Sequence, residues 1–426
     1  MGTPATIALS HADAARVWLN TRDNPMVVTA VLPLDGPLDT VVLRDLLRAR
    51  LLIHARFRAA IDLPARPWNL PRWREDLSLS LDRHVARVVL PFGSTEADIT
   101  RVVSGLASLP LPLDHPPWCA WIIDGVAPGS VLVVRVHHCI ADGLALLGVL
   151  FAVSDEGAGE LSAPVVASDS TRASRPMAAG LFHDAAALGR LLLQRADTSG
   201  LLAGRVGARK RITWSPPIDL EAVRIAAHAA DAHVNDVILA ALAGALRRAL
   251  GAQPTRPLHA LVPIAHAHAP GALGNQFASV FVALPVHLDG PVARLRFVRE
   301  SVQGARATVG LSLSRTLVDL LGTLGGIVRH AGVWFLSRKA SVVASNVPGP
   351  PRVLHLGGRA ITALHFAAPC PGSIGLSVNV ASYAGVLSLT VLADAHLAVP
   401  PEALARLFAD EVTRLVSLLV PTGAPP

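Results

Sequence analysis

The stretch that decides the fold is Val131-Leu-Val-Val-Arg-Val-His-His-Cys-Ile-Ala-Asp-Gly-Leu-Ala-Leu-Leu-Gly-Val-Leu150. Its first part, Val131–Val136, is apolar except for Arg135 and typical of a buried strand, and it leads into two adjacent histidines. A turn with Asp142 and Gly143 follows, and then an apolar segment with helical spacing. Each imidazole needs hydrogen-bond partners once it is out of water, so a histidine pair at the end of a buried strand indicates a functional site.

Strand geometry separates the two histidines. If the strand runs through His138, its side chains alternate between the two faces, and His137 and His138 point in opposite directions. Only one imidazole can then face a substrate, and the scaffold must hold the other. A neutral imidazole, whose ordinary pKa is about 6.5, can take a proton from an alcohol near neutral pH. A shared zinc ion is disfavoured, because adjacent strand residues do not easily converge on one metal.

The residues after the histidine pair have structural interpretations. Asp142 opens an apolar helical segment, where a carboxylate caps free backbone N–H groups, and this role is favoured over direct proton transfer. Gly143 is expected to relieve crowding where the backbone turns beneath the histidine. Cys139 lies next to His138, but adjacent strand positions face apart, which disfavours a thiol nucleophile.

The pattern His137-His138-Cys-Ile-Ala-Asp142-Gly143 is an HHxxxDG motif. It resembles the active-site motif of the CoA-dependent acyltransferase superfamily, which includes chloramphenicol acetyltransferase-like enzymes and condensation domains. Within that superfamily, the chain resembles the bacterial wax ester synthase/acyl-CoA:diacylglycerol acyltransferase family. Further motifs carry this resemblance and occur in the order of the family: Ser10-His-Ala-Asp-Ala-Ala-Arg-Val-Trp-Leu19, Asn24-Pro-Met26, Leu113-Asp-His-Pro-Pro-Trp118, Val234-Asn-Asp-Val-Ile-Leu-Ala-Ala-Leu-Ala-Gly-Ala-Leu-Arg247, Gly274-Asn-Gln-Phe277, Ser345-Asn-Val-Pro-Gly-Pro350 and Ser382-Tyr-Ala-Gly385.

The resemblance implies an α/β fold with two chloramphenicol acetyltransferase-like sandwich domains and an active site in a tunnel at their interface. We expect an N-terminal domain over residues 1–153, a linker with one helix over 154–211, and a C-terminal domain over 212–426. The stretch Ser154–Ser174 is rich in Ser, Ala, Gly and Asp and lacks periodicity, which is typical of an interdomain crossover.

Apolar runs and periodicity predict the main elements of both halves. The expected strands are Met26–Pro33, Trp121–Asp124, Val131–Val136, Gly375–Ala381 and Val386–Leu392. The expected helices are Val41–Ile53, Glu96–Ala107, Met177–Gln194, Val234–Leu250 and Pro401–Leu419.

The resemblance also implies an O-acyltransferase that moves a long-chain acyl group from acyl-CoA to a fatty alcohol or diacylglycerol, giving wax ester or triacylglycerol. In the family the second histidine is the general base, which assigns this role to His138, with His137 and Asp142 completing the catalytic motif. The family pairs this aspartate with an arginine. Candidate substrate-binding residues are Gly143, Trp118, Asn235, Asp236, Asn346 and Tyr383. Acyl-CoA is a substrate, and neither a cofactor nor a metal is expected.

Several of these candidates have a structural alternative. Asn235 and Asp236 begin an apolar helix, where capping is favoured over positioning of the substrate. Tyr383 is the only tyrosine, and its hydroxyl either donates to the developing oxyanion or is satisfied within the core. Asn346 precedes Val-Pro-Gly-Pro, which is a turn by composition and lies near the catalytic tunnel in the family.

Two departures from the family pattern bear on rate and substrate preference. The family usually has Pro-Val-Ser followed by arginine where this chain has Pro263-Ile-Ala-His-Ala267, and Cys119 replaces a common glutamate. Two alternatives therefore stay open: a related CoA-dependent acyltransferase with another acceptor, and a non-catalytic paralogue that binds acyl-CoA or lipid.

Composition limits the partners and the compartment. The 426 residues, half of them hydrophobic, suffice for two domains with substantial cores. The three cysteines are far apart and odd in number, which favours a reducing cytosol over a disulfide framework. Aromatic residues make up 4% and no nucleic-acid-binding motif is present, so nucleic acid is not an expected partner. The basic run Arg205–Arg211 either meets CoA phosphates or an anionic lipid surface, or is a solvated linker.

The hydropathy of the chain bears on whether it contains a transmembrane helix. Ala360–Ala393 contains no Asp, Glu, Lys or Arg, but Pro369, Pro371 and several glycines interrupt it, so two buried strands are favoured over a transmembrane helix. The N-terminus lacks a basic segment followed by an apolar core, so export is not expected. We expect a cytoplasmic protein without a transmembrane helix. Because the implied substrates are lipids, peripheral binding to the inner face of the membrane or to lipid droplets is a hypothesis.

Overall fold

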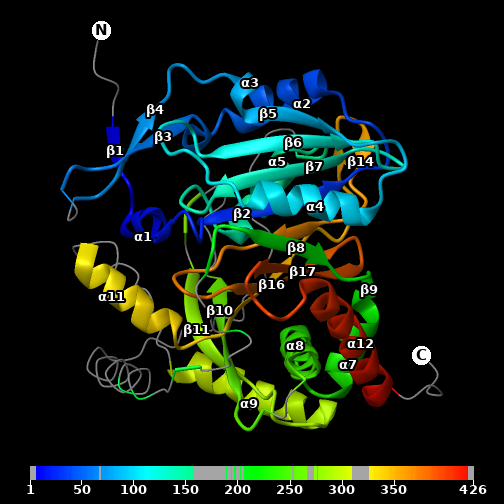
Figure 1. Ribbon diagram of the computed structural model, residues 1–426. Helices are drawn as coiled ribbons and strands as arrows, with labels where there is room; N and C mark the ends of the chain where they lie inside the picture. The colour runs from blue at the N-terminus through cyan, green and yellow to red at the C-terminus, as the bar shows by residue number, and fades with distance from the viewer. Residues whose placement is uncertain are drawn as a thin grey trace.

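The computed structural model has two α/β halves stacked on each other (Figure 1). It describes residues 6–66, 69–157, 206–251, 254–265, 273–275, 277–308 and 326–420, together with Gly189, Leu193, Ala196, Asp197 and Leu202. Several sequence-based expectations fall mainly or wholly outside these residues: the helix Met177–Gln194, the crossover Ser154–Ser174, the start of the basic run at Arg205, and His266–Ala267.

The sheet of the N-terminal half carries the histidine pair. Its five strands follow the order β15-β2-β7-β6-β5. Their bounds are β15 (His365–Ala367), β2 (Val27–Pro33), β7 (Val131–His137), β6 (Trp118–Asp124) and β5 (Val85–Val89). Strands β2 and β7 pair antiparallel, with Val27 opposite His137 and Pro33 opposite Val131. The end of β7 therefore lies beside the start of β2, and the strands expected at Met26–Pro33, Trp121–Asp124 and Val131–Val136 are confirmed.

The helices around this sheet begin where the sequence supplies caps. They are α1 (His11–Leu19), α2 (Thr40–Leu46), α3 (Leu81–His84), α4 (Glu96–Ala107) and α5 (Gly143–Val153). Helix α4 has the predicted bounds, because the Asp98 carboxylate accepts a hydrogen bond from the Thr95 N–H at 2.9 Å and closes a capping box. The helix expected over Val41–Ile53 is divided: α2 ends at Leu46, and the chain continues as the π-helical turn η1 (Leu47–Leu51).

A short helix and a small sheet complete this half. The helix is η2 (Ala55–Phe57), and the sheet has the order β1-β4-β3. Its strands are β1 (Thr6–Ala8), β4 (Arg72–Glu75) and β3 (Ala59–Asp62).

The C-terminal half is built on a sheet with the order β11-β10-β12-β16-β17-β8, with β9 also paired to β17. Its strands are β8 (Lys210–Trp214), β9 (Ile218–Asp219), β10 (Leu258–Ala265), β11 (Phe277–Leu284), β12 (Val342–Pro348), β16 (Leu376–Tyr383) and β17 (Val386–Asp394). The two strands expected within the charge-free stretch are confirmed as β16 and β17, which pair antiparallel.

The helices of this half are α7 (Leu220–Ala229), α8 (Val234–Leu250), α9 (Pro291–Thr308), α11 (Gly326–Ser337) and α12 (Pro401–Leu419). Helices α7, α8, α9 and α12 cover one face of the sheet (Figure 1), and their apolar side chains form one core with its strands. Within the described ranges, no single helix has both the length and the apolarity to cross a membrane. Helices α7 and α8 pass that test only as a pair bent by 99°.

The two halves exchange elements. Strand β15 and the hairpin of β13 (His355–Leu356) and β14 (Arg359–Ala360) follow β12 in the chain, yet β15 pairs with β2, and Leu356 packs into the N-terminal core. In the other direction, α4 lies against β8 (Figure 1). The hydroxyls of Ser104 and Ser108 accept hydrogen bonds from the Ile212 and Lys210 N–H groups, both at 2.8 Å. These contacts fix the position of the histidine turn relative to the C-terminal half.

Candidate active site

The histidine pair sits where β7 ends. The His137 N–H donates to the Pro117 carbonyl at 2.9 Å, and the His138 N–H donates to the Met26 carbonyl at 2.8 Å. Because β7 stops at His137, His138 belongs to the following turn, and the alternation of strand faces does not fix its direction. The hydrogen bonds from the flanking segments fix the main chain of both residues instead.

His137 is the buried histidine that holds the turn. Its side chain is fully buried, and its Nδ1 accepts a hydrogen bond from the Cys139 N–H at 3.2 Å. Burial, and to a smaller extent the neighbouring His138, lowers its pKa to about 3. The ring is therefore neutral at physiological pH, with its proton on Nε2.

His138 keeps 8% of its surface exposed. Burial lowers its pKa to about 4, and the charge of Arg16 lowers it further, while Asp142 and a hydrogen bond with the Asn275 side chain act in the opposite direction. The imidazole is consequently neutral at physiological pH, which is the state in which it can accept a proton.

Asp142 is structural. Its Oδ1 accepts a hydrogen bond from the Ala145 N–H at 3.1 Å and caps α5, as its position in the sequence indicates. Arg16 is buried, and its charge interacts with this carboxylate. Burial lowers the pKa of Arg16 to about 10, against the raising effect of Asp13 and then Asp142. Arg16 of α1 is therefore the candidate for the arginine that the family pairs with this aspartate.

A buried polar network reaches the histidine turn from two distant segments. Asp13 is 1% exposed. Its carboxylate forms an ion pair with Arg56 Nη2 at 3.0 Å and accepts a hydrogen bond from Asn275 Nδ2 at 2.9 Å. Asn275 Nδ2 also donates to the His138 carbonyl at 2.7 Å. The loop before β11 is therefore bonded directly to the main chain of the candidate base.

Arg56 and the neighbouring loop complete the support of the turn. Arg56 Nη1 donates to the carbonyls of Cys139 and Ile140 at 3.1 and 3.0 Å. The Asp142 N–H donates to the Gly274 carbonyl at 3.0 Å. Gly274 has φ +121°, and a Cβ there would lie 3.2 Å from the Arg56 guanidinium, so glycine is required at this position.

The roles of four residues were missed by sequence reasoning: Asp13, Arg16, Arg56 and Asn275. Three of them lie in stretches that carry the family resemblance, and a buried charged residue inside an apolar helix such as α1 is the signal that could have found Asp13 and Arg16. For Arg56, which is in the turn η2, the sequence offers no such signal.

Trp118 and Tyr383 are core residues. The Trp118 indole stacks on His84 with ring centroids 4.4 Å apart, and its Nε1 donates to the Phe57 carbonyl at 2.9 Å. The Tyr383 hydroxyl donates to the Ile361 carbonyl at 3.0 Å and accepts from the Leu354 N–H at 2.7 Å. The only donor of that hydroxyl is in use, so the core interpretation holds for Tyr383, and the role as an oxyanion donor is wrong.

Gly143 and Asn346 lie at neighbouring element ends. Gly143 is the first residue of α5, and a Cβ there would lie 3.4 Å from Val347 Cγ2 in β12. That is an ordinary contact, so crowding does not require glycine here, contrary to expectation. Asn346, one residue earlier in β12, is half-buried opposite Val380 of β16. The end of β12 therefore lies beside the start of the helix that follows the histidine turn.

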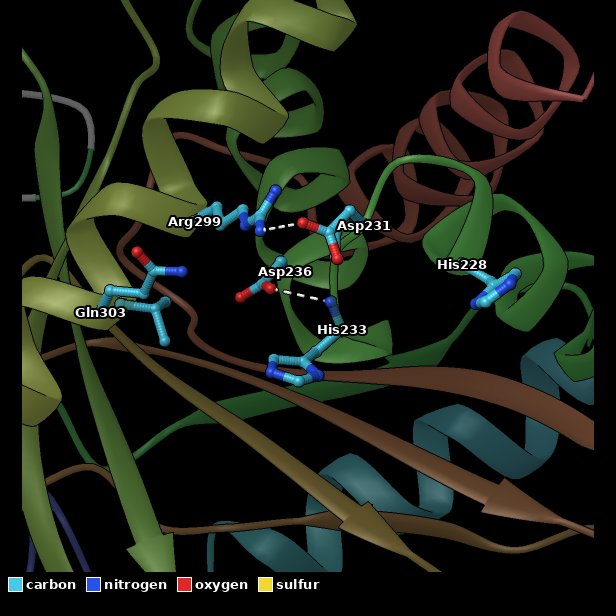
Figure 2. Close-up of a pocket in the computed structure, with 8 residues that line it drawn as sticks. His228, Asp231, His233, Asp236, Arg299 and Gln303 are labelled. Atoms are coloured by element: carbon cyan, nitrogen blue, oxygen red, sulfur yellow. Dashed lines mark hydrogen bonds and ion pairs between the residues drawn. The ribbon is translucent and has the colours of Figure 1, made fainter. Parts of the chain in front are cut away.

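Asn235 and Asp236 begin α8, away from the residues that bond the histidine turn. The Asp236 carboxylate accepts from the His233 N–H at 2.9 Å, which is the capping role that the sequence favours. Asp236 also lines a cavity of ≈ 180 Å³ where Arg299 of α9 pairs with Asp231 (Figure 2). Asn235 is half-buried beside it, and the residues that line this cavity do not include the histidine pair.

The chain matches the family model of the wax ester synthase/diacylglycerol acyltransferase catalytic domain over residues 9–194, and that of the WS/DGAT C-terminal domain over residues 273–415. A probable diacylglycerol O-acyltransferase of Mycobacterium tuberculosis is 29% identical over 432 residues, covering 92% of both chains. A putative diacylglycerol O-acyltransferase of the same organism is 28% identical over 403 residues, covering 84% of both.

Solved structures share the fold. The wax ester synthase/diacylglycerol acyltransferase from Marinobacter aquaeolei VT8 superposes with a TM-score of 0.70 at 21% identity, covering 97% of this chain and 99% of that one. The first condensation domain of the calcium-dependent antibiotic synthetase superposes with a TM-score of 0.67 at 18% identity, covering 99% and 98%.

The paired α/β halves and the HHxxxDG turn define a two-domain acyltransferase of the chloramphenicol acetyltransferase-like class, and the two-domain α/β fold expected from the sequence is confirmed. The tunnel expected at the domain interface stays a prediction. The chain belongs to the wax ester synthase/diacylglycerol acyltransferase family.

Proposed function

We propose that this protein transfers a long-chain acyl group from acyl-CoA to the hydroxyl of a diacylglycerol or a fatty alcohol, with His138 as the general base. The observation that carries the proposal is His138 itself: a nearly buried imidazole, kept neutral, whose main chain is bonded to Met26 on one side and to Asn275 on the other. Such fixed geometry is what a general base needs, because its nitrogen must meet the incoming hydroxyl within hydrogen-bond distance.

In the proposed reaction, the neutral His138 accepts the proton of the acceptor hydroxyl as its oxygen attacks the thioester carbonyl. The new C–O ester bond forms, the C–S bond breaks, and the proton passes from the imidazolium to the departing CoA sulfur. A thiol has a pKa of roughly 8.5, so this leaving group needs far less acid assistance than an alkoxide would. The step requires no covalent acyl-enzyme.

The other residues of the site act on His138 rather than on the substrate. His137 closes the turn through the Cys139 N–H, and Asp142 caps α5 and offsets part of the charge of Arg16. The network of Asp13, Arg56 and Asn275 supports this turn from outside. These contacts support a positioning role for each of the five residues.

Thiol release from palmitoyl-CoA, with and without hexadecanol or diacylglycerol, tests the proposal. We expect acceptor-dependent release by the wild type and a loss of roughly 10²–10⁴-fold in His138→Ala, as for other general bases. His228→Ala, which removes an exposed histidine of α7, is the matched control and should retain the wild-type rate.

Three results would distinguish the alternatives. Thiol release that requires an added amine or a different alcohol, with no ester formed from either lipid acceptor, indicates an acyltransferase for another acceptor. Binding of palmitoyl-CoA without release by the wild type indicates a non-catalytic binding protein. A folded His138→Ala variant with an unchanged rate would remove His138 from the mechanism.

A further inference from the structure

Helix α11 presents an aromatic and basic face to solvent. It lies at the side of the molecule next to α1 (Figure 1). His330 and Trp334 are exposed and four residues apart, so they share one face of the helix, and exposed Arg338 follows directly after its end. Trp334 is 57% exposed, and the Arg338 guanidinium lies 4.6 Å from the centre of its ring.

An adjacent side of α11 is anchored to the protein. The buried Ser337 hydroxyl is 2.8 Å from the Ser373 hydroxyl, and the buried Arg329 guanidinium lies 4.5 Å from the ring of Trp18 in α1. A Cβ at Gly372 would lie only 2.8 Å from Ser337, so this close approach requires glycine. The direction of the Trp334 face is therefore fixed by packing on the adjacent side.

The charged side chain that this face exposes is basic. From Leu320 to Ala393 the sequence contains no aspartate or glutamate, and Arg338 is exposed, whereas Arg329 and Lys339 are buried. The nearby Asp197, whose N–H donates to the Arg338 carbonyl at 2.9 Å, has a buried carboxylate that accepts from the His259 N–H and the Ser341 hydroxyl. Tryptophan favours the headgroup region of a bilayer, where its ring is apolar and its N–H is wet, and arginine binds phosphate oxygens. An exposed indole stacked against an exposed guanidinium is thus complementary to an anionic lipid surface.

We propose that the α11 face of His330, Trp334 and Arg338 docks the protein on an anionic lipid surface. A second copy of the chain fits less well, because symmetric contact would bring like charges together, and stable interfaces bury about 800 Å² per partner, more than one helix face of this kind offers. The proposal rests on the proposed function, since diacylglycerol resides in bilayers.

The place of α11 connects docking to the site. Trp18, on which Arg329 stacks, belongs to the helix that supplies Asp13 and Arg16 to the histidine turn. Asn24 Nδ2 donates to the Gly372 carbonyl at 3.0 Å, in the loop beneath α11. Docking through α11 therefore brings the lipid surface to the side of the molecule that carries these site residues.

Co-sedimentation with vesicles of equimolar phosphatidylcholine and phosphatidylglycerol tests the proposal. We expect the wild type to bind, to release at high salt, and to bind pure phosphatidylcholine poorly. Trp334→Ala should bind about tenfold more weakly and Arg338→Gln about fivefold. Phe92→Ala is the matched control, because Phe92 is a fully exposed aromatic residue far along the chain from α11, and it should bind like the wild type.

Three outcomes would overturn the proposal: unchanged vesicle binding by Trp334→Ala, equal binding to both vesicle types at all salt concentrations, or a wild-type dimer in solution that Trp334→Ala dissociates. Thiol release with a water-soluble alcohol and no vesicles separates docking from chemistry. Trp334→Ala should match the wild type in that assay. If even the wild type releases no thiol, the proposed function fails while the vesicle result stands on its own.

Discussion

Replacing Asp13 by asparagine tests the buried network that supports the histidine turn. Asparagine has the shape of aspartate but no charge, so it leaves the guanidinium groups of Arg56 and Arg16 without their shared carboxylate. Breaking a buried pair by removing one partner costs about 3–5 kcal/mol. Arg56 is partly exposed and can be hydrated, so we expect the lower end, about 3 kcal/mol.

The predicted loss is measurable in two ways. For a chain of this length the unfolding entropy is about 0.9 kcal/mol per degree, so about 3 kcal/mol lowers Tm by about 3 °C if both halves unfold together. The rate of thiol release should also fall, by roughly 10- to 100-fold, because the network fixes the His138 carbonyl and a small displacement of a base is costly.

The control is a surface carboxylate. Asp82→Asn removes the partner of Arg44 in an exposed ion pair at 3.0 Å, and it should cost less than about 1 kcal/mol and leave the rate unchanged. If Asp13→Asn unfolds at the same denaturant concentration as the wild type and turns over at the same rate, the network does not support the turn.

Three further perturbations have defined outcomes. Tyr383→Phe should cost about 1–3 kcal/mol in urea unfolding, by leaving two buried main-chain groups unpaired, with kcat unchanged; a large loss of kcat would contradict its core role. Burial lowers the pKa of His137 to about 3 and that of His365 to about 4, so between about pH 6.5 and these values only the unfolded chain binds the two protons. The free energy of unfolding should therefore fall by about 2 kcal/mol for each histidine between neutral pH and about pH 5. A urea midpoint that stays constant over this pH range would refute this. Lys210→Met leaves Asp394 buried without its 2.9 Å partner and should cost about 3 kcal/mol, whereas unchanged stability would show that the pair is not stabilising.

Elements with a strong local signal could be predicted from the sequence. The apolar run before the histidines predicted β7, the charge-free stretch interrupted by turn residues predicted β17, and the helical spacing in Glu96–Ala107 predicted α4. In contrast, β15 is a strand of three residues whose partner β2 lies more than three hundred residues earlier, and no local pattern encodes such a pairing. The π-helical turn η1 also escaped prediction: Arg50 within it donates to the Ser154 carbonyl at 2.6 Å, a contact between distant segments.

The candidate site divides in the same way. The histidine pair and Asp142 are adjacent in sequence, and their motif identifies them. Asp13, Arg56 and Asn275 come from three distant segments and meet only in the folded chain, so their joint role could not be read from spacing. For Tyr383 the residue type allowed two roles, and the positions of Leu354 and Ile361 decided between them.

The pH dependence of kcat/KM for thiol release tests the central claim most directly, because it reports the ionisation of the base in the free enzyme. With the pKa of His138 lowered to about 4, we expect a rate that stays level from about pH 8 down to about pH 5 and falls only as the pH approaches about 4, measured where the protein is folded. The His138→Ala variant should show neither the wild-type kcat/KM nor the fall in kcat/KM near about pH 4. A limb centred near pH 6.5, or one that survives in His138→Ala, would contradict a buried, neutral His138 as the base.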